Sequence, residues 1–438
     1  MLKFKNRQEL GWCFYDWANS AFATTIMSGL FPVFFKKHWC QGMEATQSTA
    51  ILGIANSLSG FFVAAIAPLI GAIADRGYYK KKFLIFFAYL GILSTTTLFM
   101  VQRENWLPAV VVYAIGAVGF SSSVIFYDSL LPSIANKKRI DYVSALGYAM
   151  GYLGGGILFA FNIWMVVHPS FFGLKDSSQA IRISFLTVAA WWGIFTLPII
   201  FFVHEPGKIT GISSGLAFRS GLKQLAHTFH KIQHMKTVFL FLIAYWFYID
   251  GVDTIARMGV DYGLSIGFEY KDLLLALLIT QFVSFPCAIV FGKLGKRIGT
   301  KYAIFIAIGV YIFAVMWAMR MKVKYEFYGL AVTIGLVQGG IQAMSRSFYS
   351  RLVPHDQLAE FYGFYNMTGK FAVILGPLLI GVTGFFFESS RIGIVSIVIL
   401  FITGGVLLFF VDEKKGAERR KYLSLPEKGH VLKFENKE

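Results

Sequence analysis

Charged residues are scarce in this chain, and their scarcity limits what the protein can be. Asp, Glu, Lys and Arg make up 15% of the 438 residues, whereas hydrophobic residues make up 56%. A soluble globular protein has roughly 25% charged residues. Because so much apolar surface has to face lipid rather than water, the composition predicts an integral membrane protein.

Cysteines and catalytic motifs are also few. The three cysteines, Cys13, Cys40 and Cys287, have spacings that fit neither a disulfide framework nor a zinc site. The sequence shows no Ser–His–Asp arrangement, no phosphate-binding G-x4-G-K pattern and no cluster of metal ligands. We therefore expect no enzyme activity, no cofactor, no bound metal and no ATP-driven pump within this chain.

The formal net charge of +17 raises the question of a nucleic-acid partner. The basic residues sit mostly in short clusters between apolar stretches, as cytoplasmic loops of membrane proteins require. This distribution argues against nucleic acid and makes the lipid bilayer the expected surrounding partner.

Twelve apolar stretches are long enough to cross a bilayer, for which a helix needs about 20 residues. They lie near 10–35, 50–74, 83–101, 107–131, 142–167, 182–203, 237–260, 272–292, 302–320, 327–349, 360–386 and 391–411. We predict an all-α integral membrane fold of twelve transmembrane helices in two pseudo-symmetric six-helix bundles. The predicted parts are an N-terminal bundle at 1–203, a cytoplasmic central loop with an amphipathic helix at 204–236, a C-terminal bundle at 237–411 and a cytoplasmic tail at 412–438.

The basic loops also orient the chain. Lysines and arginines between spans 2 and 3, 4 and 5, and 8 and 9, and in the tail, fall on one face when twelve spans are threaded, so both termini are expected in the cytoplasm. The basic N-terminus leads into an apolar run too long for a signal peptide, which predicts a retained first span. Four lysines fall on the opposite face: Lys36, Lys37, Lys322 and Lys324.

The central loop has an amphipathic pattern. Apolar residues recur at helical spacing with basic residues around them, which is typical of a helix lying in the inner membrane interface. His227, His230 and His234 offer an alternative as metal ligands. With no carboxylate or thiol nearby, the amphipathic helix is the favoured interpretation.

One polar motif occurs twice at a wide interval. The pattern Trp-x3-Asp-x2-Asn/Asp-Ser/Thr at 12–20 recurs 234 positions later at 246–254, so that Asp16 corresponds to Asp250 and Asn19 to Asp253. A glycine-rich basic loop and a Tyr-x4-Pro pair follow in the same order in each half. Parallel six-span repeats of this kind form transporters with substrate sites at their interface near the midplane.

The glycine-rich loop Gly71-x3-Asp-Arg-Gly-x2-Lys-Lys resembles the signature loop of the major facilitator superfamily. Tyr-Asp-Trp-Ala-Asn-Ser-Ala-Phe (15–22), Tyr-x-Asp-Gly-Val-x-Thr (248–254), Gln-Gly-Gly-x-Gln-Ala-x-Ser-Arg-Ser (338–347) and Gly-Lys-Phe-Ala-x2-Leu-Gly-Pro (369–377) resemble its vacuole-effluxer-like branch. That branch includes the autophagy-related vacuolar amino-acid effluxer and bacterial relatives. The resemblance covers all twelve spans and implies secondary transport, with amino-acid export implied for the fungal member alone.

Ionisable residues inside spans are the first candidates for the site, because each costs roughly 2.5–3.5 kcal/mol to insert. The repeat places Asp16 and Asp250 at equivalent depths and adds Asn19 and Asp253, so we expect these to bind substrate or a coupling ion. Asp253 and Arg257 share a helix face, and a structural ion pair between them is the alternative.

Further candidates lie in spans 5, 10 and 11. Gln338, Gln342 and Arg346 form a polar stripe about 12 Å long in span 10, where Arg346 either binds a carboxylate or forms a gate salt bridge. Lys370 lies near the midplane of span 11 and can pair with an aspartate or exchange a proton. In span 5, Gly147, Gly151 and Gly155 indicate close helix packing, and Tyr148 and Tyr152 between them are candidate cavity residues.

The resemblance to the signature loop implies a cytoplasmic gate. Asp75, Arg76 and Asp128 would form it in the first half, with Arg76 paired to Asp128. Arg297 stands in the second loop, where Lys296 replaces the expected acid, so we expect the gate to be strongest on the first-half side.

These observations predict a secondary active transporter working by alternating access. Acids, bases and amides in one site favour a small polar or zwitterionic, amino-acid-like solute, with H+ as the expected coupling ion. We expect a monomer in a bacterial inner membrane. The alternatives are export of amphipathic compounds or lipids, and a non-transporting membrane receptor or scaffold.

Overall fold

A computed structural model describes residues 4–77, 79–135, 140–205, 235–353, 361, 364–365, 368–369, 371 and 374–412. Over these residues the chain is helical, and no strand occurs among them. The predicted amphipathic helix and the three histidines of the central loop lie outside the described residues, as does the tail after Asp412.

Ten helical segments of the described chain are long and apolar enough to cross a membrane. The first, Arg7–Trp39, is built from α1 (Arg7–Ala21), the π-helix η1 (Phe22–Leu30), α2 (Phe31–Phe34) and the π-helix η2 (Phe35–Trp39). The others are α4 (Lys80–Leu98), α5 (Trp106–Ile134), α6 (Ile140–Val167), α7 (Ser177–Phe202), α9 (Lys236–Ser265), α10 (Tyr270–Ile298), α11 (Thr300–Arg320), α12 (Lys324–Leu352), and α15 (Ser390–Ser396) continued by α16 (Val398–Phe409).

Two more helices stand where the remaining spans were predicted. α3 (Ala45–Gly77) covers the predicted span at 50–74, and α14 (Leu375–Phe386) covers the second part of the span at 360–386. The all-α multi-pass prediction is therefore confirmed. The exact count of twelve spans stays a prediction.

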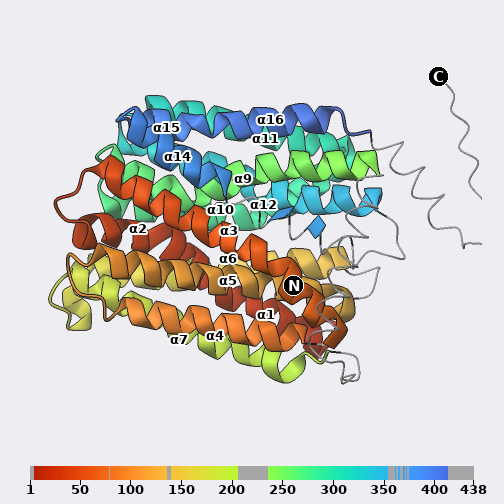
Figure 1. Ribbon diagram of the computed structural model, residues 1–438, viewed down its shortest axis with the longest axis horizontal. Coiled ribbons are helices and arrows are strands. Elements are labelled where there is room, and N and C mark those ends of the chain that lie inside the picture. Colours follow the sequence, from red (N-terminus) through yellow and green to blue (C-terminus); the bar gives the residue numbers. More distant parts are fainter. Residues whose placement is uncertain are drawn as a thin grey trace, which may run out of the picture.

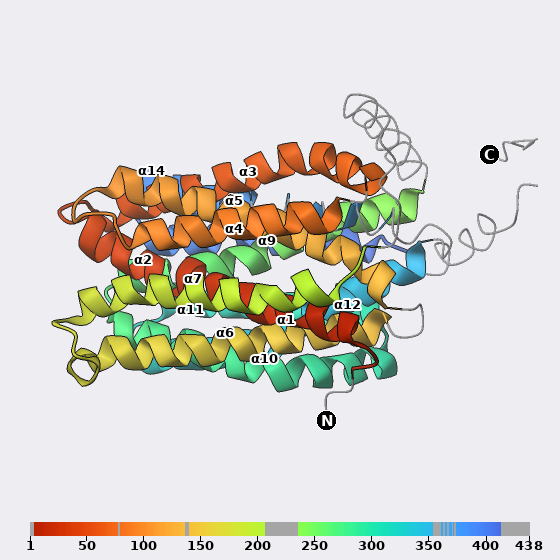
Figure 2. The ribbon, with the colours of Figure 1, turned by 90° about the horizontal axis from the view of Figure 1, so that it is seen from below.

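The helices run side by side along the long axis of the molecule (Figure 1). In Figure 1 most of the helices before the central loop lie below those after it, and Figure 2 shows from below that both sets run along the same axis. α3 and α6 of the first half pack against α14 and α10 of the second. The α3–α14 approach is close because Gly53 faces the carbonyl of Pro377, and the Ser57 hydroxyl donates a hydrogen bond to the carbonyl of Ile374 at 2.9 Å.

Lysines fix the outermost helices of each half at one end. Lys81 at the start of α4 donates to the carbonyls of Ile200, in the last turn of α7, and of Val203, which follows α7, at 2.6 and 2.7 Å. Lys301 at the start of α11 donates to Phe409 and Val411 at the end of α16, at 2.9 and 2.7 Å. The last carbonyls of a helix lack partners within it and carry partial negative charge, so a lysine there satisfies both needs.

Arginines make the matching contacts at the opposite end. Arg182 of α7 donates to the carbonyl of Phe99, which follows α4, at 2.7 Å from Nη2. Arg391 of α15 donates to the carbonyls of Met319 and Met321 at the end of α11, the latter at 2.8 Å. In each half, therefore, the third and the last helices are fastened at both ends by the same kinds of side chain.

Candidate functional site

A cavity of about 330 Å³ lies between the two halves. Residues of both halves line it, among them the polar stripes of the first span, α9 and α12. Of the predicted substrate or coupling residues, the cavity lining includes Asp16, Asn19, Tyr148, Tyr152, Asp253, Gln338, Gln342 and Arg346, together with the predicted gate residue Asp128.

The first span supplies one polar wall of this cavity. Asp16 and Ser20 of α1 and Thr24 and Ser28 of η1 all line it. They are spaced four apart, and the polar face continues from the α-helical into the π-helical part of the span. Short π-helical insertions in α-helices are frequent at functional sites.

Gly151 of α6 makes room for this wall. A Cβ at that position would lie 2.6 Å from the Ser20 hydroxyl oxygen and 3.2 Å from the Asp16 carboxyl carbon. The glycine of the predicted packing motif therefore brings α6 against the acidic end of the first span. Tyr148 and Tyr152, on either side of it in the sequence, line the same cavity.

Asp250 is placed differently from its counterpart Asp16. It is fully buried and is not among the described residues that line the cavity. Its carboxylate accepts hydrogen bonds from the backbone N–H groups of Leu375 and Gly376, both at 3.0 Å, and from the Thr254 hydroxyl at 3.2 Å. In this structure Asp250 thus caps the N-terminus of α14.

The two aspartates still share one local arrangement. Asp16 and Ser20 pack on Gly151, and Asp250 and Thr254 pack on Gly376. α6 continues through Gly151, so its amides are used within the helix. α14 begins at Leu375, and its first amides have no intrahelical carbonyl to bind, which makes them donors for Asp250.

Arg346 connects the halves at the far end of the polar stripe on α12. Its Nη2 donates to the Tyr148 hydroxyl at 3.0 Å, and its guanidinium carbon lies 4.8 Å from the centre of the tyrosine ring. A guanidinium over an aromatic face adds a cation–π attraction to the hydrogen bond. Contact across the halves accords with the gate alternative, and the role of Arg346 stays a prediction.

Asp253 and Arg257 of α9 both line the cavity. No ion pair joins them among those of the described residues. The structural ion pair that was the alternative for these two residues is therefore not formed in this structure.

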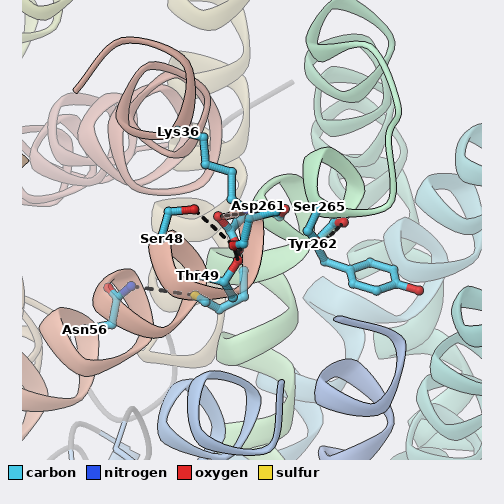
Figure 3. Close-up of polar contacts among 9 residues, drawn as sticks. Lys36, Ser48, Thr49, Asn56, Asp261, Tyr262 and Ser265 are labelled. Carbon is cyan, nitrogen blue, oxygen red and sulfur yellow. Dashed lines mark hydrogen bonds and ion pairs between the residues drawn. The ribbon is translucent and has the colours of Figure 1, made fainter. Parts of the chain in front are cut away.

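A buried ion pair holds the halves together at the opposite end of the first span. Lys36 Nζ of η2 lies 2.8 Å from Asp261 Oδ1 of α9, and the two side chains are 9% and 1% exposed. Lys36 also donates to the Asp261 carbonyl at 3.0 Å and to the Thr49 hydroxyl of α3 at 2.8 Å. Thr49 lies 2.7 Å from Asp261 Oδ2, so that side chains of three helices converge (Figure 3).

The neighbouring Lys37 also reaches the second half, with Nζ 4.6 Å from the ring centre of Tyr270 in α10. We name Lys36, Lys37, Thr49, Asp261 and Tyr270 the outer latch. Sequence reasoning did not find it, although the two lysines violated the expected charge distribution. That violation was the available signal.

The remaining predicted site residues either have side chains outside the described part of the structure or lie away from the cavity. Lys370 and the side chains of Asp75 and Arg76 lie outside what the structure describes. Arg297 is exposed near the end of α10 and is not part of the described cavity lining. The cytoplasmic gate stays a prediction.

Comparison with known proteins places the chain among transporters. A family model described as "Vacuole effluxer Atg22 like" matches residues 38–421. An uncharacterized MFS-type transporter of Bacillus subtilis, YxiO, is 40% identical over 95% of this chain and 98% of its own length. Autophagy-related protein 22 of Yarrowia lipolytica is 22% identical over 85% of this chain and 77% of its own.

Solved structures show the same fold at low sequence identity. A D-xylose–proton symporter superposes with a TM-score of 0.68 at 13% identity, covering 93% of this chain and 98% of its own. The nucleoside transporter NupG gives 0.60 at 15% identity, covering 92% and 98%. These likenesses show the major facilitator fold.

Proposed function

The chain belongs to the vacuole effluxer Atg22-like family of MFS-type transporters, and we propose that it moves a small polar or zwitterionic solute by alternating access. The observation that carries this proposal is the cavity between the halves, lined by carboxylates, amides and hydroxyls from both of them and by guanidinium groups from the second half. A site with both signs of charge suits a solute that carries both, such as an amino acid.

Alternating access needs two bodies that move against each other. We assign them to residues 1–203 and 237–411, joined by the loop at 204–236. The end contacts of Lys81 and Arg182 in one half and of Lys301 and Arg391 in the other support each body's rigidity. We assign the closed end of the cavity to the outer latch, and we expect the opposite, cytoplasmic end to open first.

Coupling to protons is proposed through Asp16, which lines the cavity. A carboxylate that faces both the solute and water can bind a proton in one state of the cycle and release it in the other. Asp253 and Lys370 remain candidates for the same role. The protein is expected in a bacterial inner membrane as a monomer with both termini in the cytoplasm.

The test is solute uptake into proteoliposomes containing the purified protein, with a pool of radiolabelled amino acids and an imposed pH gradient. We expect gradient-dependent uptake that Asp16→Asn abolishes. Uptake that responds to the gradient equally in wild type and Asp16→Asn would remove the coupling role of Asp16. Absence of uptake of every amino acid would remove the amino-acid-like substrate.

An amphipathic solute or a lipid is the second candidate, and the second-half wall of the cavity favours it. That wall is largely apolar, with Leu273, Leu277, Val315, Leu330 and Ile334 among its members. Movement of a fluorescent lipid between leaflets of the same proteoliposomes separates this candidate from transport of a polar solute. A receptor or scaffold without transport would show neither movement.

A further inference from the structure

Arg257 is a charged cavity residue to which neither the fold nor the proposed coupling gives a use. It lies in α9, partly exposed to the cavity, eight residues before the end of the helix at Ser265. No hydrogen bond and no ion pair joins it to another residue in the part of the chain that the structure describes.

An arginine without a hydrogen-bond or ion-pair partner inside a membrane span is energetically unfavourable. The bilayer interior cannot solvate a guanidinium group, and charged residues within spans normally pair with a partner. Arginine cannot relieve the cost by losing its proton, as lysine can. In this structure the cavity is what can solvate the charge, and we therefore expect an anion to meet it there during the working cycle.

The other described arginine of the cavity is already engaged. Arg346 donates to Tyr148 and stacks on its ring. Among the described residues that line the cavity, Arg257 thus has a guanidinium group whose N–H donors are available to a ligand. Five N–H donors in a rigid fork match the two oxygens of a carboxylate.

The lining of the cavity to which Arg257 belongs indicates what kind of anion fits. The hydroxyls of Thr24 and Ser28 line the cavity from the first span and offer further hydrogen bonds. The second-half lining of the same cavity includes the apolar residues Val260, Leu273, Ala276, Leu277, Ala314 and Val315. A cavity that combines a cation with an apolar wall suits an organic anion with a hydrocarbon body better than a small hydrated inorganic ion.

We propose that Arg257 binds the carboxylate of the transported solute, whose apolar part lies against the second-half wall. The inference rests on the proposed transport function and deepens it. Arg257 then selects for carboxylic acids and zwitterions, and it excludes amines and amides of the same shape, because these leave the guanidinium without an anion.

Ligand-induced thermal stabilisation of the detergent-purified full chain tests the assignment. The probes are valine, 3-methylbutanoate, valinamide and sodium chloride at equal ionic strength, measured on wild type, Arg257→Lys and Arg257→Gln. We expect valine and 3-methylbutanoate to stabilise wild type and valinamide not to. Apparent affinity for the carboxylates should fall by about tenfold or more in Arg257→Gln, and by less in Arg257→Lys.

Several outcomes overturn the proposal. Equal stabilisation by valine and valinamide, or no stabilisation of wild type by either carboxylate, removes the carboxylate site. Stabilisation by chloride alone identifies Arg257 as a site for an inorganic anion and rejects the organic solute. Carboxylate binding that is unchanged in Arg257→Gln moves the site elsewhere.

A second measurement needs no ligand. An unpaired charge inside the membrane destabilises the empty protein, so Arg257→Met is expected to melt at the same temperature as wild type or higher. A clearly lower melting temperature would show a structural role and contradict the proposal. Flux in proteoliposomes separates this inference from the proposed function. Carboxylate binding without flux rejects transport but keeps Arg257 as the binding site. Flux that is unchanged in Arg257→Gln keeps transport but rejects Arg257 as the binding site.

Discussion

Two aspartates at corresponding positions of the halves make different contacts. Asp16 lines the cavity, whereas Asp250 binds the backbone amides at the start of α14. Each lies above a glycine of the packed helix, Gly151 or Gly376. The difference arises because one packed helix is continuous at that level and the other begins there. One repeated sequence motif thus supplies a candidate ligand in one half and a helix cap in the other.

The two aspartates should therefore respond differently to the same substitution. Asp250→Asn replaces a carboxyl group that accepts from two backbone N–H groups by an amide with a single acceptor oxygen, and we expect a loss of about 1–2 kcal/mol in stability. Asp16→Asn should abolish transport while changing the melting temperature little. Thermal unfolding and flux of both variants check this, and a melting temperature of Asp250→Asn equal to that of wild type contradicts the capping role.

At the scale of elements, close helix contacts shape the cavity. α6 lies against the acidic end of the first span at Gly151, where an added Cβ would meet Ser20 and Asp16. At Gly259 of α9, which also lines the cavity, an added Cβ would meet nothing within 4 Å. These two glycines form a matched pair that separates packing from helix propensity.

Alanine substitutions use this pair. Gly151→Ala should push α6 from the first span and lower both the melting temperature and transport. Gly259→Ala should be neutral or stabilise the protein by up to about 1 kcal/mol, because alanine is the better helix former. Thermal unfolding and uptake are measured on both variants to test this difference. Equal effects of the two would show that Gly151 is not a packing constraint.

The outer latch is the other element-scale feature. It joins η2 and α3 to α9 and α10 through Lys36, Lys37, Thr49, Asp261 and Tyr270. Breaking a buried ion pair by removing one partner leaves an uncompensated charge, which costs about 3–5 kcal/mol. Removing Asp261 should therefore favour states in which this end of the cavity is open and Lys36 reaches water.

Asp261→Asn tests this by accessibility. With the native cysteines replaced and Ser28→Cys added as the reporter, labelling by a membrane-impermeant thiol reagent from outside should be faster in Asp261→Asn than in its parent. The charge-reversed pair Lys36→Asp with Asp261→Lys should restore slow labelling. Unchanged labelling in Asp261→Asn would show that the ion pair does not hold this end closed.

For the whole molecule, much of the fold and part of the cavity lining could be predicted from the sequence, whereas the contacts between the halves could not. Hydrophobic runs predicted the membrane fold, and ionisable residues singled out within them, among them Asp16, Asp253 and Arg346, line the cavity. Periodicity along one chain cannot show where a helix is interrupted, so Asp250 was expected to resemble Asp16. Nor can it show which charges meet across the halves, as Lys36 and Asp261 do.

In the proposed transport cycle the two halves alternately open and close the ends of one cavity. A reversible cross-link across the outer latch tests whether they do. In a cysteine-free background, Lys37→Cys and Tyr270→Cys would be joined by a cleavable thiol cross-linker in proteoliposomes, and uptake of the radiolabelled amino-acid pool measured before cross-linking, after it and after cleavage. We expect uptake to stop on cross-linking and to return on cleavage. Uptake that continues with the outer latch cross-linked would contradict it.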